Sequence, residues 1–316
     1  MKLPKSQLKR TKQVNLIKIT AINLLIMVIV LNIAYCKMAH AKIVNMESTK
    51  GPNITTSKYR GHLKTSNSIQ DVVNHPSFKG FGQFILPLDR GTYDGNMQLD
   101  RVGSLLPYHS QIEPEAVVKT INYMIDQVAD GKTIFYAFYT ERQKLETPAK
   151  QNTGLFFFKG KPGAPFGIIC PGGGFSYVGS VHEGFPHAIE LSKKGYNAFV
   201  LQYRVGGEQG ACEDLAAAIS YIFQHAKSLG VSTKGYSVWG SSAGARMAAQ
   251  IGSHGPAGYG DYNLPRPGVV VMAYTGHPSF TKNDPPAFVV QGENDGIVDV
   301  SAVERRRCHA KGRNRG

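Results

Sequence analysis

The chain has 316 residues, enough for one large α/β core, and a formal net charge of +14. Its two ends, residues 1–41 and 305–316, contain seven and six of the 36 Lys and Arg residues and no Asp or Glu. Residues 42–304 therefore carry 23 basic and 22 acidic side chains. Because no basic stripe or nucleic-acid-binding motif occurs in this nearly neutral part, we expect no nucleic-acid partner.

Residues 1–41 have the features of a secretory signal peptide. Basic residues precede an apolar run from Ile19 to Ala34, and Ala39-His40-Ala41 offers a small-residue cleavage site. We therefore predict a signal peptide over 1–41 and a secreted or periplasmic protein. The alternative is an uncleaved N-terminal anchor, because the apolar run approaches the length that spans a membrane. Contact with a membrane is expected only in that case.

The rest of the chain divides by composition into three parts. Residues 42–80 are polar and without periodicity, which predicts a loosely ordered leader or linker, whereas 81–304 have the pattern of a globular domain. Residues 305–316 form a basic, irregular tail. The cysteines after residue 41 have no metal-ligand spacing and are too few for a disulfide framework, so we expect neither a metal nor a cofactor.

The predicted elements of the globular part alternate between strand and helix. A capping box at Ser110–Glu113 precedes a helix that runs to about Ala129, and two aromatic-rich strands follow as an antiparallel pair at a sheet edge. The strands are expected at Thr133–Tyr139, Gly154–Lys159, Phe166–Cys170, Asn197–Tyr203, Tyr236–Trp239, Val269–Tyr274 and Ala287–Gln291, and the later helices at Glu183–Lys193, Ala211–Leu229 and Ala243–Ile251. Continuous apolar strands between helices predict an α/β fold: a mostly parallel sheet covered on both faces, with sites at the carboxyl ends of its strands.

The sequence Gly240-Ser241-Ser242-Ala243-Gly244 has the G-x-S-x-G pattern of a nucleophile elbow. The pattern is common by chance in a glycine-rich chain, but here an apolar strand precedes it and a small-residue helix follows. A sharp strand-to-helix turn holds a serine in a strained conformation, with its hydroxyl exposed at a helix N-terminus. We therefore predict Ser242 as the catalytic nucleophile.

Three consecutive glycines, Gly172–Gly174, follow the strand that ends at Cys170. Backbone N–H groups unobstructed by side chains can bind the oxyanion of a tetrahedral intermediate. We predict that Gly173 and Gly174 form an oxyanion hole together with Ala243. A plain glycine turn is the alternative. However, serine hydrolases with a nucleophile elbow are expected to have a glycine loop of this kind about 70 residues before the elbow.

A carboxylate and a histidine would complete a catalytic triad. Asp295 lies in a turn after the last predicted strand, so it would follow the serine and precede the histidine, which is the order in serine hydrolases with a nucleophile elbow. Glu293 and Asp299 are the alternatives for the acid. His309 alone follows Asp295, but it lies in the tail, where no periodic element would fix it. The other histidines near the predicted site, His182, His187 and His277, are expected to be structural or to face the substrate, so the general base stays open.

The motifs together resemble the α/β-hydrolase superfamily, in its branch of secreted carbohydrate esterases similar to acetylxylan and feruloyl esterases, and prolyl-oligopeptidase-like enzymes. The residues that carry the resemblance are Pro171–Phe175, Glu183–Pro186, Tyr203–Arg204, Asp214–Ala218, Gly240–Gly244 and Gly292–Asp295. The resemblance implies a serine hydrolase that cleaves acyl esters of a small-molecule or polysaccharide substrate. It covers residues 130–300 and implies the roles given above for Ser242, Asp295 and the glycine loop.

The C-terminal segment departs from the pattern of the superfamily. Members usually carry a final strand, a Gly-His segment and a closing helix, in whose place this chain has an Arg- and Gly-rich tail. We therefore expect that the last strand and helix are missing through a truncation or frame shift near residue 304. A catalytically inactive homologue and a prolyl-oligopeptidase-like peptidase are the alternatives to an active esterase.

Overall fold

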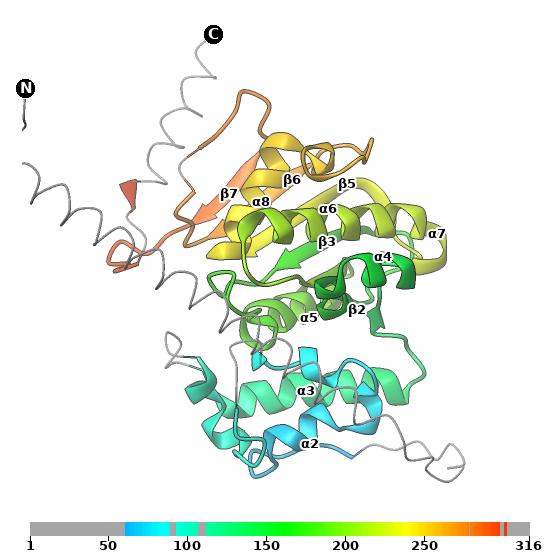
Figure 1. Cartoon of the computed structure of the whole chain (residues 1–316), viewed down its shortest axis with the longest axis vertical. Helices are drawn as coiled ribbons and strands as arrows, with labels where there is room; N and C mark the ends of the chain where they lie inside the picture. Colours follow the sequence, from blue (N-terminus) through cyan, green and yellow to red (C-terminus); the bar gives the residue numbers. More distant parts are fainter. Residues whose placement is uncertain (1–60, 89–92, 107–111, 278, 298–299, 302–316) are drawn as a thin grey trace, which may run out of the picture. The chain divides into compact units, whose positions relative to one another are not determined.

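A seven-stranded sheet in the order β1-β2-β4-β3-β5-β6-β7 forms the centre of the fold (Figure 1). The computed structural model describes residues 61–88, 93–106, 112–277, 279–297 and 300–301, all of which lie in one compact unit of the chain. Strands β4, β3, β5, β6 and β7 are parallel to one another, while β2 is antiparallel to both β1 and β4. The predicted α/β fold with a mostly parallel sheet is therefore confirmed.

The strands lie where the apolar runs of the sequence placed them. They are β1 (Phe135–Tyr136), β2 (Gly154–Phe158), β3 (Pro165–Cys170), β4 (Asn197–Gln202), β5 (Ser232–Ser241), β6 (Val269–Ala273) and β7 (Ala287–Val290). Every residue of β2 and β4 is buried, because helices cover both faces of the sheet at its centre. The predicted antiparallel pair at the edge is β1 and β2, although β1 is much shorter than expected.

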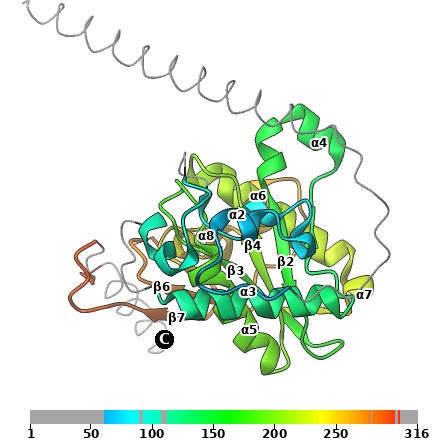
Figure 2. The same ribbon diagram turned by 90° about the horizontal axis from the view of Figure 1, so that it is seen from below.

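Two helical layers bury the two faces of the sheet. Helices α6 (Glu208–Gln224) and α8 (Ala243–His254) pack on one face, in a cluster with Val238 and Met272, and α7 (Ala226–Leu229) follows α6. Helices α3 (Pro114–Ala129) and α5 (Phe185–Lys193) pack on the other face, in a cluster with Phe156 and Val200. Figures 1 and 2 show these two helix pairs on opposite sides of the strands.

Residues 61–80, predicted as part of a loosely ordered leader, are structured. They contain α2 (Ile69–Val73), which a capping box between Ser68 and Asp71 begins, and the 3₁₀ turn η1 (Pro76–Phe78). Ile69, Val72 and Phe78 are buried in the same cluster as α3. Two further 3₁₀ segments, η2 (Gly82–Phe84) and η4 (Leu99–Leu105), continue this region. A few apolar side chains, spaced too irregularly to show a period, are enough to attach it to the core.

The capping box predicted ahead of α3 does not begin that helix. Glu113 is the N-cap without a side-chain cap hydrogen bond, and Pro114 occupies the first turn, where its missing N–H costs nothing. The link between β1 and β2, where no helix was predicted, contains α4 (Glu141–Glu146) and the 3₁₀ segment η5 (Pro148–Asn152). No residue of α4 is buried, and the helix stands at the periphery in Figure 2.

Several predicted features fall outside the described residues: the signal peptide 1–41, residues 42–60 of the leader, Ser110, Asp299, and the tail with His309. Among the helices that the structure does describe, none is long and apolar enough to cross a membrane. The described residues also contain no group of three or more His, Cys, Asp or Glu side chains arranged to hold a metal ion.

Candidate active site

Ser242 lies at the turn between β5 and α8, with φ 50° and ψ −116°. Such a left-handed conformation is unfavourable for a residue with a β-carbon, so the surrounding structure must enforce it. The N–H of Ser242 donates to the carbonyl of Ala273 at the end of β6 (3.0 Å), and its own carbonyl accepts from Ala245 and Arg246. The side chain is neither fully buried nor fully exposed. The structure thus gives Ser242 the strained elbow geometry that the motif predicts.

The two glycines of the motif are required by close packing. A β-carbon on Gly240 would overlap the carbonyl of Gly244, and one on Gly244 would overlap the carbonyl of Cys170 at the end of β3. Only a residue without a β-carbon lets α8 begin this close to β3 and β5. The elbow therefore lies directly against the segment that leads into the glycine loop.

The glycine loop reaches Ser242, the predicted nucleophile. A β-carbon added to Gly172 would lie 3.0 Å from Cβ of Ser242 and 2.9 Å from the carbonyl oxygen of Ser241. Gly173 (φ 140°) and Gly174 (φ 59°) have backbone conformations that favour glycine, and Phe175 after them also has a positive φ of 58°. Loop and elbow thus meet at the carboxyl edge of the sheet, as predicted.

Three N–H groups at this meeting point have no hydrogen-bond acceptor among the residues that the structure describes. They belong to Gly173, Gly174 and Ala243, the donors predicted for an oxyanion hole. Ala243 is the first residue of α8, so its N–H also lies at the positive end of the helix dipole. An anion held here by these groups would need no rearrangement of the backbone hydrogen bonds.

The connection from β4 to α6 contacts both ends of the glycine loop, at Pro171 and at Phe175. The Tyr203 hydroxyl donates to the carbonyl of Pro171 (2.8 Å), and the N–H of Gly206 donates to the carbonyl of Phe175 (2.7 Å). The aromatic rings of Phe175 and Tyr203 also pack edge to face, with centroids 6.3 Å apart. Both ends of the loop are therefore tied to one connection.

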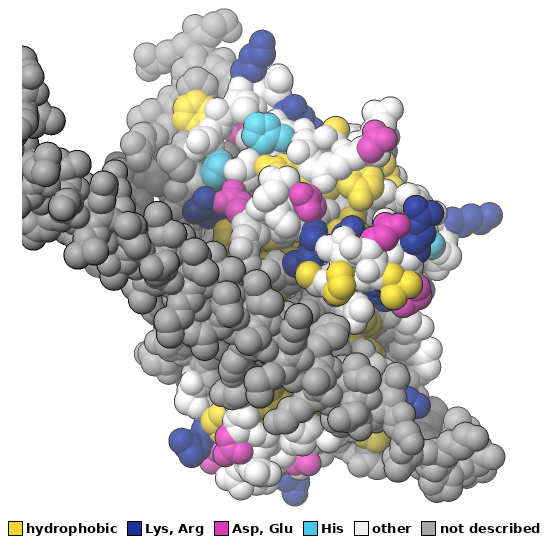
Figure 3. Space-filling view, in the orientation of Figure 1, with side chains coloured by type: hydrophobic (Ala, Val, Ile, Leu, Met, Phe, Trp, Pro, Cys, Tyr) yellow, Lys and Arg dark blue, Asp and Glu magenta, His cyan; other side chains and the backbone are white. Residues whose placement is uncertain are grey.

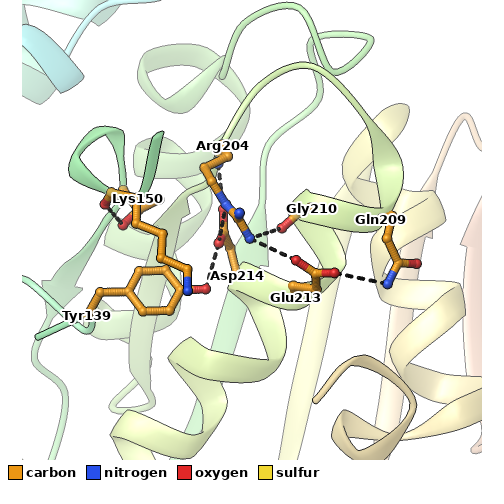
Figure 4. Close-up of polar contacts among 8 residues, drawn as sticks. Tyr139, Lys150, Arg204, Gln209, Gly210, Glu213 and Asp214 are labelled. Carbon is orange, nitrogen blue, oxygen red and sulfur yellow. Dashed lines mark hydrogen bonds and ion pairs between the residues drawn. The ribbon is translucent and has the colours of Figure 1, made fainter. Parts of the chain in front are cut away.

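A buried carboxylate fixes this connection in turn (Figure 4). Asp214 on α6 is fully buried and accepts from the backbone N–H of Arg204 (2.7 Å), from Nε of Arg204 (2.8 Å) and from the Tyr139 hydroxyl (2.7 Å). The Arg204 guanidinium also donates to the Gly210 carbonyl and to Glu213. Burial, with the adjacent Asp214 carboxylate, raises the pKa of Tyr139, so its hydroxyl stays protonated as a donor.

Asp295 follows β7 and is half buried. Its carboxylate accepts from Nε2 of Gln291 and from the N–H of Ile297, both at 2.9 Å. Because β5, β6 and β7 are parallel neighbours, Asp295 and Ser242 lie at the same edge of the sheet, separated by one strand. Glu293, an alternative acid, is exposed. The position of Asp295 fits the predicted acid, and its catalytic role stays a prediction.

The described histidines near the site each contact their own element or loop. His187 on α5 contacts the Glu183 carbonyl (2.9 Å), and the backbone N–H of buried His277 donates to Oγ1 of Thr275. Nε2 of His182 lies 3.6 Å from Oε1 of Glu183. The structure does not describe His309, so the identity of the base stays a prediction.

Two residues of this site were not predicted from the sequence. Glu183 is 4% exposed and accepts the N–H of Gly172 at 2.5 Å. Tyr274 follows β6 with φ 40°, and the side chains of Glu183 and Ser241 lie close enough to its hydroxyl to influence its pKa. Burial and the Glu183 carboxylate raise the pKa of Tyr274. Glu183 belongs to a segment that carries the family resemblance, which was the only signal for it.

Comparisons with known proteins agree with this architecture. Residues 159–259 match the family model described as BD-FAE. Endo-1,4-beta-xylanase B of Butyrivibrio fibrisolvens is 27% identical over 175 residues, which are 42% of this chain and 27% of that protein. The chain therefore matches only about a quarter of the length of this curated relative. The predicted resemblance to carbohydrate-esterase-like α/β-hydrolases is confirmed.

Two solved structures are also similar. One is an α/β hydrolase from a Medee basin deep-sea metagenome library, with 25% identity, 51% of this chain and 72% of that chain covered, and a TM-score of 0.46. The other is an acetyl ester-xyloside bifunctional hydrolase from Caldicellulosiruptor lactoaceticus, with 22% identity, 56% of this chain and 81% of that chain covered, and a TM-score of 0.49.

Proposed function

We propose that this chain, which carries an α/β-hydrolase segment of the carbohydrate-esterase kind, is a serine esterase that cleaves acetyl or other acyl esters of sugars. The observation that carries the proposal is the position of Ser242: a strained, partly exposed serine directly against Gly172 of the glycine loop. The next two loop residues, Gly173 and Gly174, have N–H groups without acceptors in the described chain, as has Ala243. A tetrahedral oxyanion needs donors of this kind. The match to BD-FAE and the similarity to a xylanase sequence support a sugar ester as the substrate.

The reaction would run in two steps through an acyl-enzyme. Oγ of Ser242 attacks the ester carbonyl carbon while a histidine accepts its proton, and the oxyanion is bound by the N–H groups of Gly173, Gly174 and Ala243. The histidine then protonates the leaving sugar oxygen, and water releases the acid in a second attack. By sequence order the base is His309 and the acid that orients it is Asp295. His182, His187 and His277 are the alternatives for the base.

The proposal predicts that Ser242 reacts covalently and that its removal abolishes activity. The wild-type protein should bind a fluorophosphonate at Ser242, identified by mass spectrometry, and should hydrolyse p-nitrophenyl acetate. Ser242→Ala should lose labelling and lower kcat by about 10⁴-fold or more, as loss of a nucleophile does. Ser228→Ala, which changes an exposed serine on α7, is the matched control and should keep full activity.

The same assay separates the two alternatives. A protein that unfolds cooperatively but neither reacts with fluorophosphonate nor hydrolyses esters would overturn the esterase and favour an inactive homologue. Faster turnover of peptide substrates than of acetyl esters would favour a peptidase. Acetylated xylan and p-nitrophenyl acetate, compared as substrates, would test the sugar specificity.

We also propose that the protein is exported, on the basis of the basic and apolar segment over residues 1–41. Expression of the full chain in a bacterial host should release a protein whose N-terminal residue is Lys42. Intact Met1 on a protein that stays in the membrane fraction would instead indicate an uncleaved anchor.

A further inference from the structure

Glu183 is a carboxylate placed inside the wall of the active site rather than on its surface. It lies in a π-helical turn, η6 (Ser180–Gly184), that leads into α5, and it is 4% exposed. A β-carbon added to Gly172 would lie 2.5 Å from Oε2 of Glu183 and 3.0 Å from Cβ of Ser242. Carboxylate, glycine loop and nucleophile therefore meet around one backbone position.

Glu183 and the N-cap residue of its turn, Gly179, bind the two polar backbone groups of Gly172. Oε2 of Glu183 accepts the Gly172 N–H at 2.5 Å, and the Gly172 carbonyl accepts the N–H of Gly179 at 3.0 Å. In a trans peptide the N–H of the next residue points opposite to the carbonyl. Fixing the Gly172 carbonyl thus fixes the direction of the Gly173 N–H, the first predicted oxyanion donor.

Glu183 also has a neighbour on the side of Ser242. The hydroxyl of Tyr274 lies close enough to the side chains of Glu183 and of Ser241, the residue before Ser242, for both to influence its pKa. Tyr274 is itself locked in a left-handed conformation (φ 40°), and its N–H donates to the carbonyl of Val290 on β7 (2.7 Å). The carboxylate therefore binds the glycine loop and lies beside the residue that follows β6.

We propose that Glu183 is a positioning residue that sets the orientation of the oxyanion donors Gly173 and Gly174 relative to Ser242. A hydrogen bond to an ionised carboxylate is roughly twice as strong as a neutral one, which suits a loop of glycines that has no side chains to hold it. The inference rests on the proposed function, because the oxyanion is that of the esterase reaction. It assigns Glu183 a role through the loop and not in proton transfer.

The test compares Glu183→Ala, Glu183→Gln and Glu183→Asp with the wild-type full chain. With p-nitrophenyl acetate, Glu183→Ala should lower kcat by about 10²-fold and change KM by less than about threefold, because the oxyanion donors act in the transition state. Glu183→Gln keeps an acceptor oxygen and should restore kcat to within about tenfold of the wild type. Glu183→Asp keeps the charge but withdraws the oxygens, so it should resemble Glu183→Ala.

Hydrogen exchange of the segment 171–179, read by mass spectrometry, provides a measurement that does not depend on activity. Exchange of this segment should be faster in Glu183→Ala and Glu183→Asp, and close to wild type in Glu183→Gln. The matched control is Asp284→Asn, which alters a carboxylate bonded to Ser253 and Thr281, away from the loop. It should change neither kcat nor exchange of 171–179.

The outcomes separate this inference from the proposed function. An active wild type with unchanged kcat and unchanged exchange in folded Glu183→Ala and Glu183→Asp would overturn the positioning role alone. A wild type that neither labels nor turns over would overturn the esterase, while the exchange data would still decide whether Glu183 orders the loop. If Glu183→Ala does not fold, Glu183→Asp and Glu183→Gln decide the question by the same readouts.

Discussion

At the scale of single residues, the site depends on places where a β-carbon cannot fit. Gly244 is the clearest case, because it lies in the first turn of α8 and its backbone packs directly against the end of β3. This close approach lets the turn at Ser242 lie beside the glycine loop. The role of Gly244 is therefore steric, and it can be tested through stability.

We expect Gly244→Ala to lower the free energy of unfolding by about 3 kcal/mol, because the new methyl group overlaps the carbonyl of Cys170 in a packed core. Gly207→Ala is the control: Gly207 lies at the start of a helix too, as the N-cap of α6, but a β-carbon there meets nothing within 4 Å. Urea unfolding of both variants measures the difference. Equal stability of the two would contradict the steric role.

The sequence predicted some residues of the site and missed others for physical reasons. Ser242 was predictable because its conformation demands a fixed local pattern of small residues around it. The position of Asp295 was predictable from its place after a strand, while its role stays a prediction. The positions of Glu183 and Tyr274 in the site were not predictable, because the two residues come together from segments far apart in sequence, one before α5 and the other after β6.

At the scale of elements, continuous apolar strands and periodic helices were predictable, whereas short segments were not. The structure has each predicted strand and helix of the central α/β part within a few residues of its expected place. By contrast, α2 and η1 are too short for their few buried apolar residues to show a period, and α4 has no buried residue at all. Capping and contacts with α3 decide the first two, and neither is visible in composition.

The region of α2 and η1 should lose stability in acid through His75. This side chain is 5% exposed; its Nε2 contacts the Gly61 carbonyl (2.9 Å), and its Nδ1 accepts the N–H of Ser77 (3.2 Å). Burial lowers the pKa of His75, with a smaller effect of nearby His62. Protonation would place a second N–H against that of Ser77. Stability from neutral His75 is therefore complete above pH 6.5 and decreases as the pH falls below it.

We expect the wild type to lose of the order of 1 kcal/mol more unfolding free energy between pH 7.5 and pH 5.5 than His75→Asn does. Asn cannot titrate, yet its side-chain oxygen can accept the same N–H at the start of η1. Urea unfolding at the two pH values gives the comparison. The same loss in both proteins would show that other groups cause the acid sensitivity.

At the scale of the whole molecule, the basic net charge is a property of the chain ends. On the face that Figure 3 shows, Lys and Arg side chains are interspersed with Asp and Glu, and the described surface has no continuous basic area there. This agrees with the nearly neutral balance of residues 42–304. The expectation of no nucleic-acid partner stays a prediction.

The two described cysteines offer a measure of global unfolding. Cys170 on β3 and Cys212 on α6 are free, fully buried thiols in the larger core cluster, and burial raises the pKa of both. With Cys36 and Cys308 replaced by Ser, a thiol reagent should therefore react only when the core opens. The labelling rates should follow the unfolding equilibrium across urea concentrations. Rapid labelling of either thiol in native buffer would indicate local opening of the sheet.

Three non-glycine residues of the described chain, Phe175, Ser242 and Tyr274, have positive φ angles, and they follow β3, β5 and β6. Unfavourable conformations are thus concentrated along one rim, while the interior of the sheet is relaxed. Selection for thermal tolerance alone would accept substitutions at this rim first, since relief of strain there is gained without disturbing the core. A variant stabilised in that way would keep its fold and lose the backbone geometry on which the proposed esterase reaction depends.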